Sequence, residues 1–203
     1  MTSSDDDRWN HNFHYHALVL DALPSVCTRV LDVGCGEGTL ARKLVARAND
    51  VVALDCDEPV IEQARLTTDP ADPISYILGD LLTYPFEEGT FDAVVSIATV
   101  HHMNEEAAFA KMAALVRPGG VVVVVGLARP NALIDWLYEG AGFFATRWLQ
   151  MSRKHFEPNV PLVWPPPSTY TQIRSIAAQV LPNVQYKRRV LFRYSLIWTK
   201  PSA

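Results

Sequence analysis

The chain has 203 residues, 49% of them hydrophobic, a formal net charge of −4 and a pI near 5.8. This length predicts one domain with a full hydrophobic core. The acidic balance argues against a protein that binds nucleic acid through its phosphates. Apolar runs are too short to cross a bilayer, and the acidic, polar N-terminus predicts no signal peptide.

Short β-rich runs alternate with helical segments in the first two thirds of the chain. Strands are predicted at 29–34, 51–55, 74–79, 92–98 and 121–128, with helices at 39–48, 58–66 and 104–116. The run VVVVVGLA at 121–128 is continuously apolar, which is typical of a strand buried on both faces. This alternation predicts an α/β fold, with right-handed βαβ units wound around a parallel sheet.

The alternation stops at Arg129, and no strand is predicted from there to Pro182. Segment 132–151 is helical in character and rich in aromatic residues, whereas the proline-rich segment 155–170 predicts an irregular loop.

A last helix and a hairpin are predicted to close the chain. Ser168 or Thr169 is expected to cap a helix that ends at about Val180. Residues 184–192 and 193–200 then predict two antiparallel strands.

Three glycines follow the first predicted strand and precede the first helix, which is the position of a nucleotide-binding turn. Gly34, Gly36 and Gly38 give the spacing G-x-G-x-G, so Thr39 stands where a dinucleotide-binding turn has its third glycine. Glycines in such a turn allow positive φ and a close approach of backbone N–H groups to a ligand.

Two carboxylates accompany the glycines. Asp32 ends the strand and Glu37 lies within the turn. They would repel a pyrophosphate but attract a cation. S-adenosylmethionine (SAM) carries both an ammonium and a sulfonium, so the charge pattern favours SAM over NAD.

Two further acids end the next two strands. Asp55 can accept the hydroxyls of a ribose, which SAM and NAD share, and Asp80 can accept the amino group of adenine. Each has a simpler alternative: Asp55 as the N-cap of the 58–66 helix and Asp80 as a turn residue.

The motifs VLDVGCGEG, ALDCDEP, GDLLTYPFEEGTFDAVVSIATVHHM and LVRPGG occur in this order between about Arg29 and Gly126. Together they resemble the motif series of the class I SAM-dependent methyltransferases, in the broad branch that includes small-molecule methyltransferases. The resemblance implies a Rossmann-like, doubly wound sheet of seven mostly parallel strands in the order 3-2-1-4-5-7-6. It also implies SAM as cofactor and S-adenosylhomocysteine (SAH) as product.

The resemblance also assigns parts of the single domain 1–203. These are an N-terminal cap segment (1–28), a SAM-binding core (29–128), an aromatic-rich lid insertion between strands five and six (129–167), and a last helix with the C-terminal hairpin (168–203). It implies a cofactor-binding set with Asp32, Gly34 and Gly36 at the methionine end, Asp55 on the ribose, Cys56, Asp80 and Leu81 around the adenine, Ser96 or Ile97 offering a backbone carbonyl as acceptor to the amino acid moiety, and Cys35 and Gly38 in the turn.

Histidines provide the candidate bases. His101 and His102 follow the fourth strand, and a histidine with a pKa near 6.5 can deprotonate a hydroxyl, thiol or amine. His101 is the leading candidate, and the alternative is that the pair only orders its loop. Tyr15 and His16, on an expected N-terminal helix, are predicted to line the substrate side, with a surface or helix-staple role as the alternative.

The aromatic insertion contributes Trp136 and Trp148 as candidate substrate contacts. Its first interpretation is a lid over an apolar substrate. The alternatives are core packing or a dimer face, and a helix that associates weakly with a membrane.

The favoured function is therefore SAM-dependent methylation, on oxygen or nitrogen, of a small and fairly apolar molecule by a cytoplasmic monomer or homodimer. One alternative is a SAM-binding protein without methyl transfer, either pericyclase-like or regulatory. Another is a protein or RNA methyltransferase, which is weakened because SIATVHH after strand four lacks an N/D-P-P-Y signature. Three cysteines without metal-ligand spacing predict neither a metal site nor a disulfide framework.

Overall fold

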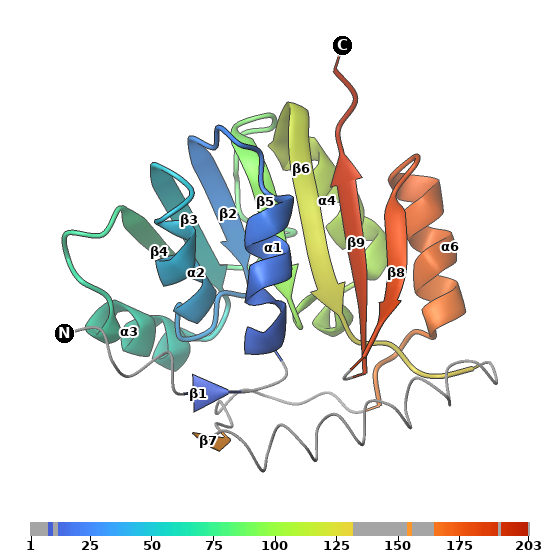
Figure 1. The fold of residues 1–203 in the computed structure, drawn as a ribbon, viewed down its shortest axis with the longest axis horizontal. Helices are drawn as coiled ribbons and strands as arrows, with labels where there is room; N and C mark the ends of the chain where they lie inside the picture. The colour runs from blue at the N-terminus through green and yellow to red at the C-terminus, as the bar shows by residue number, and fades with distance from the viewer. Residues whose placement is uncertain (1–7, 10–11, 132–153, 156–164, 191, 203) are drawn as a thin grey trace.

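The computed structural model describes residues 8–9, 12–131, 154–155, 165–190 and 192–202. Its main sheet has seven strands in the order β4-β3-β2-β5-β6-β9-β8 (Figure 1). Numbered along the chain within this sheet, the order is 3-2-1-4-5-7-6, which confirms the predicted topology. The predicted lid residues Trp136 and Trp148 lie outside the described residues.

The sheet is parallel from β4 to β6, and β9 runs antiparallel to both β6 and β8. Its strands are β2 (Arg29–Val33), β3 (Asp50–Asp55), β4 (Ile74–Leu78), β5 (Phe91–Ile97), β6 (Val116–Gly126), β8 (Gln185–Arg189) and β9 (Arg193–Thr199). Because the carboxyl ends of the parallel strands share one edge of the sheet, their loops meet there.

Helices cover both faces of the sheet (Figure 1). The 3-10 helix η1 (Phe13–Tyr15) and α1 (His16–Ala22), α2 (Thr39–Leu44) and α3 (Glu58–Thr67) pack on one face, around Val30, Val51 and Val95. Helices α4 (Glu105–Leu115) and α6 (Tyr170–Val180) pack on the other, around Leu31, Val52 and Val94. Alternate residues of the buried strands thus serve two separate cores, as their continuous apolar runs require.

The last helix begins as the sequence predicts. Thr169 accepts the Gln172 amide through its hydroxyl, and the Gln172 side chain accepts the Thr169 amide in return. This reciprocal capping box satisfies two backbone donors at the start of α6.

Two predicted boundaries are wrong, and one strand was missed. Helix α2 ends at Leu44 rather than Ala48, because bonds to carbonyls three residues back, from Ala46 to Lys43 and from Arg47 to Leu44, tighten its last turn. Strand β6 begins at Val116 and includes RPGG as an irregularity in its pairing with β5. The expectation of no strand between Arg129 and Pro182 missed β7 (Lys154–His155), which pairs in parallel with β1 (Arg8–Trp9). Two-residue strands carry no periodicity that a sequence could reveal.

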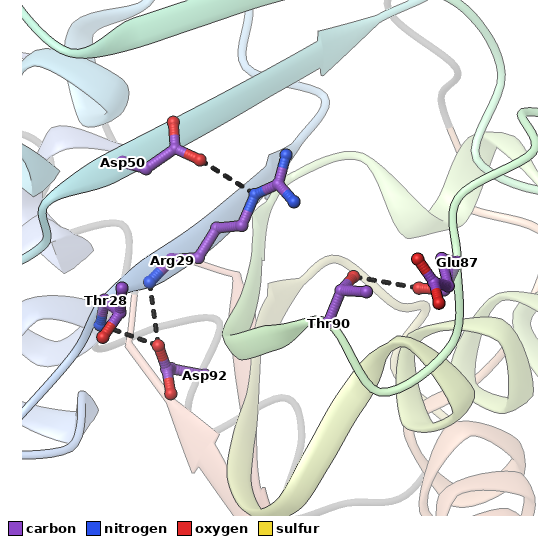
Figure 2. A network of polar contacts seen from close by, with 6 residues as sticks. All are labelled: Thr28, Arg29, Asp50, Glu87, Thr90 and Asp92. Carbon is purple, nitrogen blue, oxygen red and sulfur yellow. Dashed lines mark hydrogen bonds and ion pairs between the residues drawn. The ribbon is translucent and has the colours of Figure 1, made fainter.

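A buried carboxylate joins the beginnings of β2 and β5. Asp92, 2% exposed, accepts the amides of Thr28 and Arg29 at 2.7 and 2.8 Å and pairs with the Arg117 guanidinium. Figure 2 shows the two amide bonds, together with the half-exposed ion pair between Arg29 and Asp50 at 2.8 Å. The Asp92 interactions align neighbouring strands at the edge opposite the loops described below.

We expect Asp92→Ala to lower the free energy of unfolding by about 2–4 kcal/mol, because it leaves two partly buried amides and the Arg117 guanidinium without their acceptor. The control is Asp50→Ala, which removes an exposed ion pair from the same network and should cost less than about 1 kcal/mol. Urea unfolding followed by circular dichroism measures both. Equal losses in the two variants would contradict this assignment.

Candidate functional site

A cavity of about 300 Å³ lies where the carboxyl ends of β2, β3, β4 and β5 meet the N-terminal segment. Ten of the residues predicted for the site line it, namely His16, Asp32, Gly34, Cys35, Gly36, Asp55, Cys56, Asp80, Ile97 and His102. The chain folds this way because each loop leaves the sheet at the same edge.

The glycine turn follows β2, and its three glycines have φ of 71°, 54° and 76°. A Cβ at Gly34 would collide with the Thr99 side chain, and one at Gly38 with the Tyr76 hydroxyl. A Cβ at Gly36 would meet nothing within 4 Å, yet Gly36 lines the cavity. Hence only Gly36 leaves room for a ligand, whereas Gly34 and Gly38 make room for neighbouring side chains.

Asp55, at the end of β3, holds this turn from the side. Its Oδ2 accepts the Gly36 amide at 2.9 Å and its Oδ1 accepts the Asp57 amide at 3.1 Å. The carbonyl of Leu54 accepts the amides of Gly34 and Cys35. The sequence predicted Asp55 as a ribose ligand or a helix cap, and it did not reveal this bond to the glycine turn.

Asp32 is the most buried carboxylate in the cavity wall, with 1% of its surface exposed. Its Oδ2 has no hydrogen-bond partner among the described residues. Burial raises the pKa of the Asp32 carboxyl to about 8, and the nearby Asp55 carboxylate adds to the shift. A cationic ligand would supply the missing partner and favour the ionised form.

The cavity wall is strongly acidic. Five carboxyl groups line it, those of Asp32, Glu37, Asp55, Asp57 and Asp80, and among the described lining residues there is no lysine or arginine. The N-terminal segment and the loop after β5 add a less polar part of the wall, including Phe13, Ile97, Ala98 and Met103. The cavity thus suits a ligand with a positive charge and an apolar portion.

The two histidines after β5 lie in the 3-10 helix η2 (Val100–His102), with ring centroids 4.0 Å apart, but their surroundings differ. His102 is exposed and lines the cavity, whereas His101 is 5% exposed and does not. Desolvation lowers the pKa of His101 to about 4, with help from the charges of His102 and Arg193. His101 is therefore neutral and enclosed, and the order of preference between the two candidates reverses.

Four other predicted residues do not line the cavity. Tyr15 is buried, and its hydroxyl donates to the Val190 carbonyl at 2.5 Å. Leu81 packs in the core, and the buried Ser96 hydroxyl donates to the Val33 carbonyl. Gly38 faces Tyr76. Tyr15, Leu81 and Ser96 are therefore buried in the packing of the domain and do not form the wall of the cavity.

The structure also adds lining residues that sequence reasoning missed. Asn12 and Phe13 come from the segment before α1, and Thr99 and Met103 from the loop after β5. Phe13 and Met103 were undetectable because lone apolar residues near helices usually indicate core packing. Only their position beside a motif loop was a signal.

The raised pKa of Asp32 has a consequence for stability. The unfolded carboxyl, with a pKa of 3.8, loses its proton well before the native one, at about 8. Stability from this group is therefore fully present below about pH 4 and is lost as the pH rises toward 8, by at most about 1.4 kcal/mol per pH unit. Asp32→Asn should flatten this slope. Urea unfolding of both proteins at pH 5 and pH 8 measures it, and parallel pH profiles would contradict the burial argument.

Comparisons with known proteins identify the family of the chain. A methyltransferase-domain family matches residues 30–120. Over 198 residues, the chain is 36% identical to an uncharacterised methyltransferase of Mycobacterium bovis, covering 97% of this chain and 99% of the relative. It is 34% identical over 119 residues to a demethylmenaquinone methyltransferase of Renibacterium salmoninarum, covering 58% of this chain and 49% of that protein.

Among solved structures, a phosphoethanolamine N-methyltransferase 2 of Haemonchus contortus, in complex with phosphomonomethylethanolamine and SAH, superposes with a TM-score of 0.66. The two are 17% identical, and the match covers 96% of this chain and 53% of that one, so this likeness concerns the fold. The full-length relative, the matched domain family and the seven-stranded topology establish the family. The chain belongs to the class I SAM-dependent methyltransferases.

Proposed function

We propose that the chain transfers a methyl group from SAM to an oxygen or nitrogen atom of a small, fairly apolar molecule. The observation that carries this proposal is the composition of one cavity, with five carboxylates from the glycine turn and the ends of β2, β3 and β4, and apolar residues from the other loops. The carboxylates match a cationic cofactor, and the apolar residues match an uncharged acceptor.

The residues present fit SAM. Asp32 is a buried carboxylate whose Oδ2 lacks a hydrogen-bond partner among the described residues, and an ammonium group supplies one. Gly36 leaves open space beside it, while Asp55 and Asp80 carry carboxylate oxygens at the ends of the next two strands. We therefore assign Asp32, Gly36, Asp55, Cys56 and Asp80 to cofactor binding.

When bound, SAM supplies a methyl group on a sulfonium sulfur, a leaving group that is already activated. The chain's own contribution is to align the acceptor and to exclude water. Phe13 and Met103 provide apolar surface for this purpose. One relative is, by its name, a demethylmenaquinone methyltransferase, which supports a small-molecule acceptor.

His102 is the proposed base. Its ring lines the cavity and is exposed, and burial lowers its pKa while the Asp55 carboxylate opposes that shift. The imidazole is thus neutral at pH 7 and able to accept a proton from a hydroxyl or an amine. His101 packs behind it and limits where the His102 ring can lie.

Cofactor binding is tested by calorimetric titration with SAH, with NAD as the control ligand. We expect SAH to bind with a Kd near micromolar, about −8 kcal/mol, and NAD not to bind. Asp32→Asn should weaken SAH binding by about tenfold, because it removes the charge that faces the ligand's ammonium. Absence of SAH binding to the folded protein would refute the proposal.

The same titration detects the proton on Asp32. At pH 7 a carboxyl with a pKa of about 8 is mostly protonated, so binding of an ammonium should release a proton. The apparent binding enthalpy then depends on the ionisation enthalpy of the buffer. Asp32→Asn should abolish this dependence. This result would separate the loss of the Asp32 proton on binding from a change in the shape of the cavity.

The base is tested with an acceptor identified by screening small hydroxylated and amine compounds for SAH production. His102→Gln should lower kcat by about 100-fold while leaving the Kd for SAH within about twofold. The matched control is His101→Gln, which changes the adjacent ring outside the cavity wall and should cost less in kcat. Equal kcat in His102→Gln and the unchanged enzyme would exclude the role.

A further inference from the structure

One wall of the cavity comes from the N-terminal segment, which precedes the motif series in the chain. Asn12, Phe13 and His16 all line the cavity, and they belong to η1, the residue before it and the first residue of α1. Helix α1 itself is anchored by Val19, which is fully buried on the sheet. The packing of Val19 holds α1 on the sheet, but it does not explain what holds the residues before α1 against the cavity.

Two hydrogen bonds join this turn to the end of the chain. The Nη2 of Arg193 donates to the Oδ1 of Asn12 at 2.8 Å, across 181 residues of sequence. The Tyr15 hydroxyl donates to the carbonyl of Val190, in the connection between β8 and β9, across 175 residues. In each bond one partner, Arg193 or Val190, belongs to the β8–β9 hairpin and the other belongs to the N-terminal segment. The hairpin therefore contacts the segment that forms one wall of the cavity.

Arg193 is suited to this connection. It is the first residue of β9, it is 7% exposed, and it does not line the cavity itself. The planar guanidinium fixes the direction of its donors, which a flexible ammonium does not. The backbone carbonyl of Arg193 accepts a bond from Arg188 at 2.8 Å, so the residue is held on its own side as well.

We propose that Arg193 is a positioning residue for cofactor binding, which holds Asn12 in the wall of the cavity and so fixes the segment Asn12–His16 over it. Arg193 acts through Asn12, because Asn12 lines the cavity and Arg193 does not. The inference rests on the assignment of the cavity to SAM. It adds to cofactor binding a contribution from the C-terminal hairpin, which lies outside the glycine turn and the ends of the parallel strands.

The test is a double-mutant cycle on the Kd for SAH, measured by calorimetry with Asn12→Ala, Arg193→Gln and the double variant. Each single variant should raise the Kd by about five- to tenfold, and the double variant should raise it no further, because both remove the same contact. Hydrogen exchange of the amides in α1 should quicken in Arg193→Gln, while exchange in β2 and β3 stays unchanged.

Arg189→Gln is the matched control. It removes an arginine of the same hairpin whose Nε donates to the Ser195 hydroxyl at 2.8 Å and which does not line the cavity. Its Kd for SAH should stay within twofold. If Arg193→Gln fails to fold, Asn12→Ala and Tyr15→Phe break the two connections separately, with the arginine retained, and each should raise the Kd.

The outcomes are distinguishable. If the unchanged protein does not bind SAH, the proposed function fails and the positioning role fails with it. If the unchanged protein binds SAH and Asn12→Ala binds equally well, only the positioning role is overturned. Additive losses in the double variant would also overturn it, because they would mean that Arg193 acts on the cavity by a route other than Asn12.

Discussion

The hydrogen bond between the Gly36 amide and the Asp55 carboxylate is the interaction on which the cavity depends. It joins the turn after β2 to the end of β3, so Gly36, which alone among the three glycines of this turn has open space beside it, is held by the acid of the neighbouring strand. Thr99 and Tyr76 fill the positions that side chains on Gly34 and Gly38 would occupy, and these contacts hold the rest of the turn. These contacts hold the turn in the conformation that lines the cavity without a ligand, and such preorganisation reduces the entropy lost on binding.

Charge is the second constraint. Five carboxyl groups around one cavity repel one another, and the structure tolerates them because Asp55 accepts backbone amides, Asp80 accepts the amides of Leu82 and Thr83, and burial keeps a proton on Asp32 at neutral pH. A cationic ligand would favour the ionised form of Asp32 and reduce the repulsion among the carboxylates. The same group that costs stability as the pH rises would then become a binding group, so the site gives up some stability of the unliganded protein in exchange for affinity.

The two ends of the chain complete the wall of the cavity at the ends of the parallel strands. The N-terminal segment brings Asn12, Phe13 and His16 to the cavity, and the β8–β9 hairpin contacts that segment through Arg193 and Val190. The residues that line the cavity thus come from separate parts of the chain, one group from the ends of β2, β3, β4 and β5 and the loops after them, and the other from the segment Asn12–His16. Among the described residues, no helix is both long and apolar enough to cross a membrane.

The sequence by itself determined the alternation of strands and helices, the strand ends near which Asp32, Asp55 and Asp80 lie, and the capped start of α6, because hydrophobic periodicity and capping chemistry are local signals. The order of the strands in the sheet came from the resemblance of the motif series to a known family. It could not rank His101 against His102, since adjacent residues differ only in which way the turn of η2 points them, one into the core and one into the cavity. Nor could it place Tyr15 outside the wall and Asn12 within it, because partners more than 170 residues away hold both. Those choices belong to tertiary packing, which alone brings the two ends of the chain together over the ends of the parallel strands.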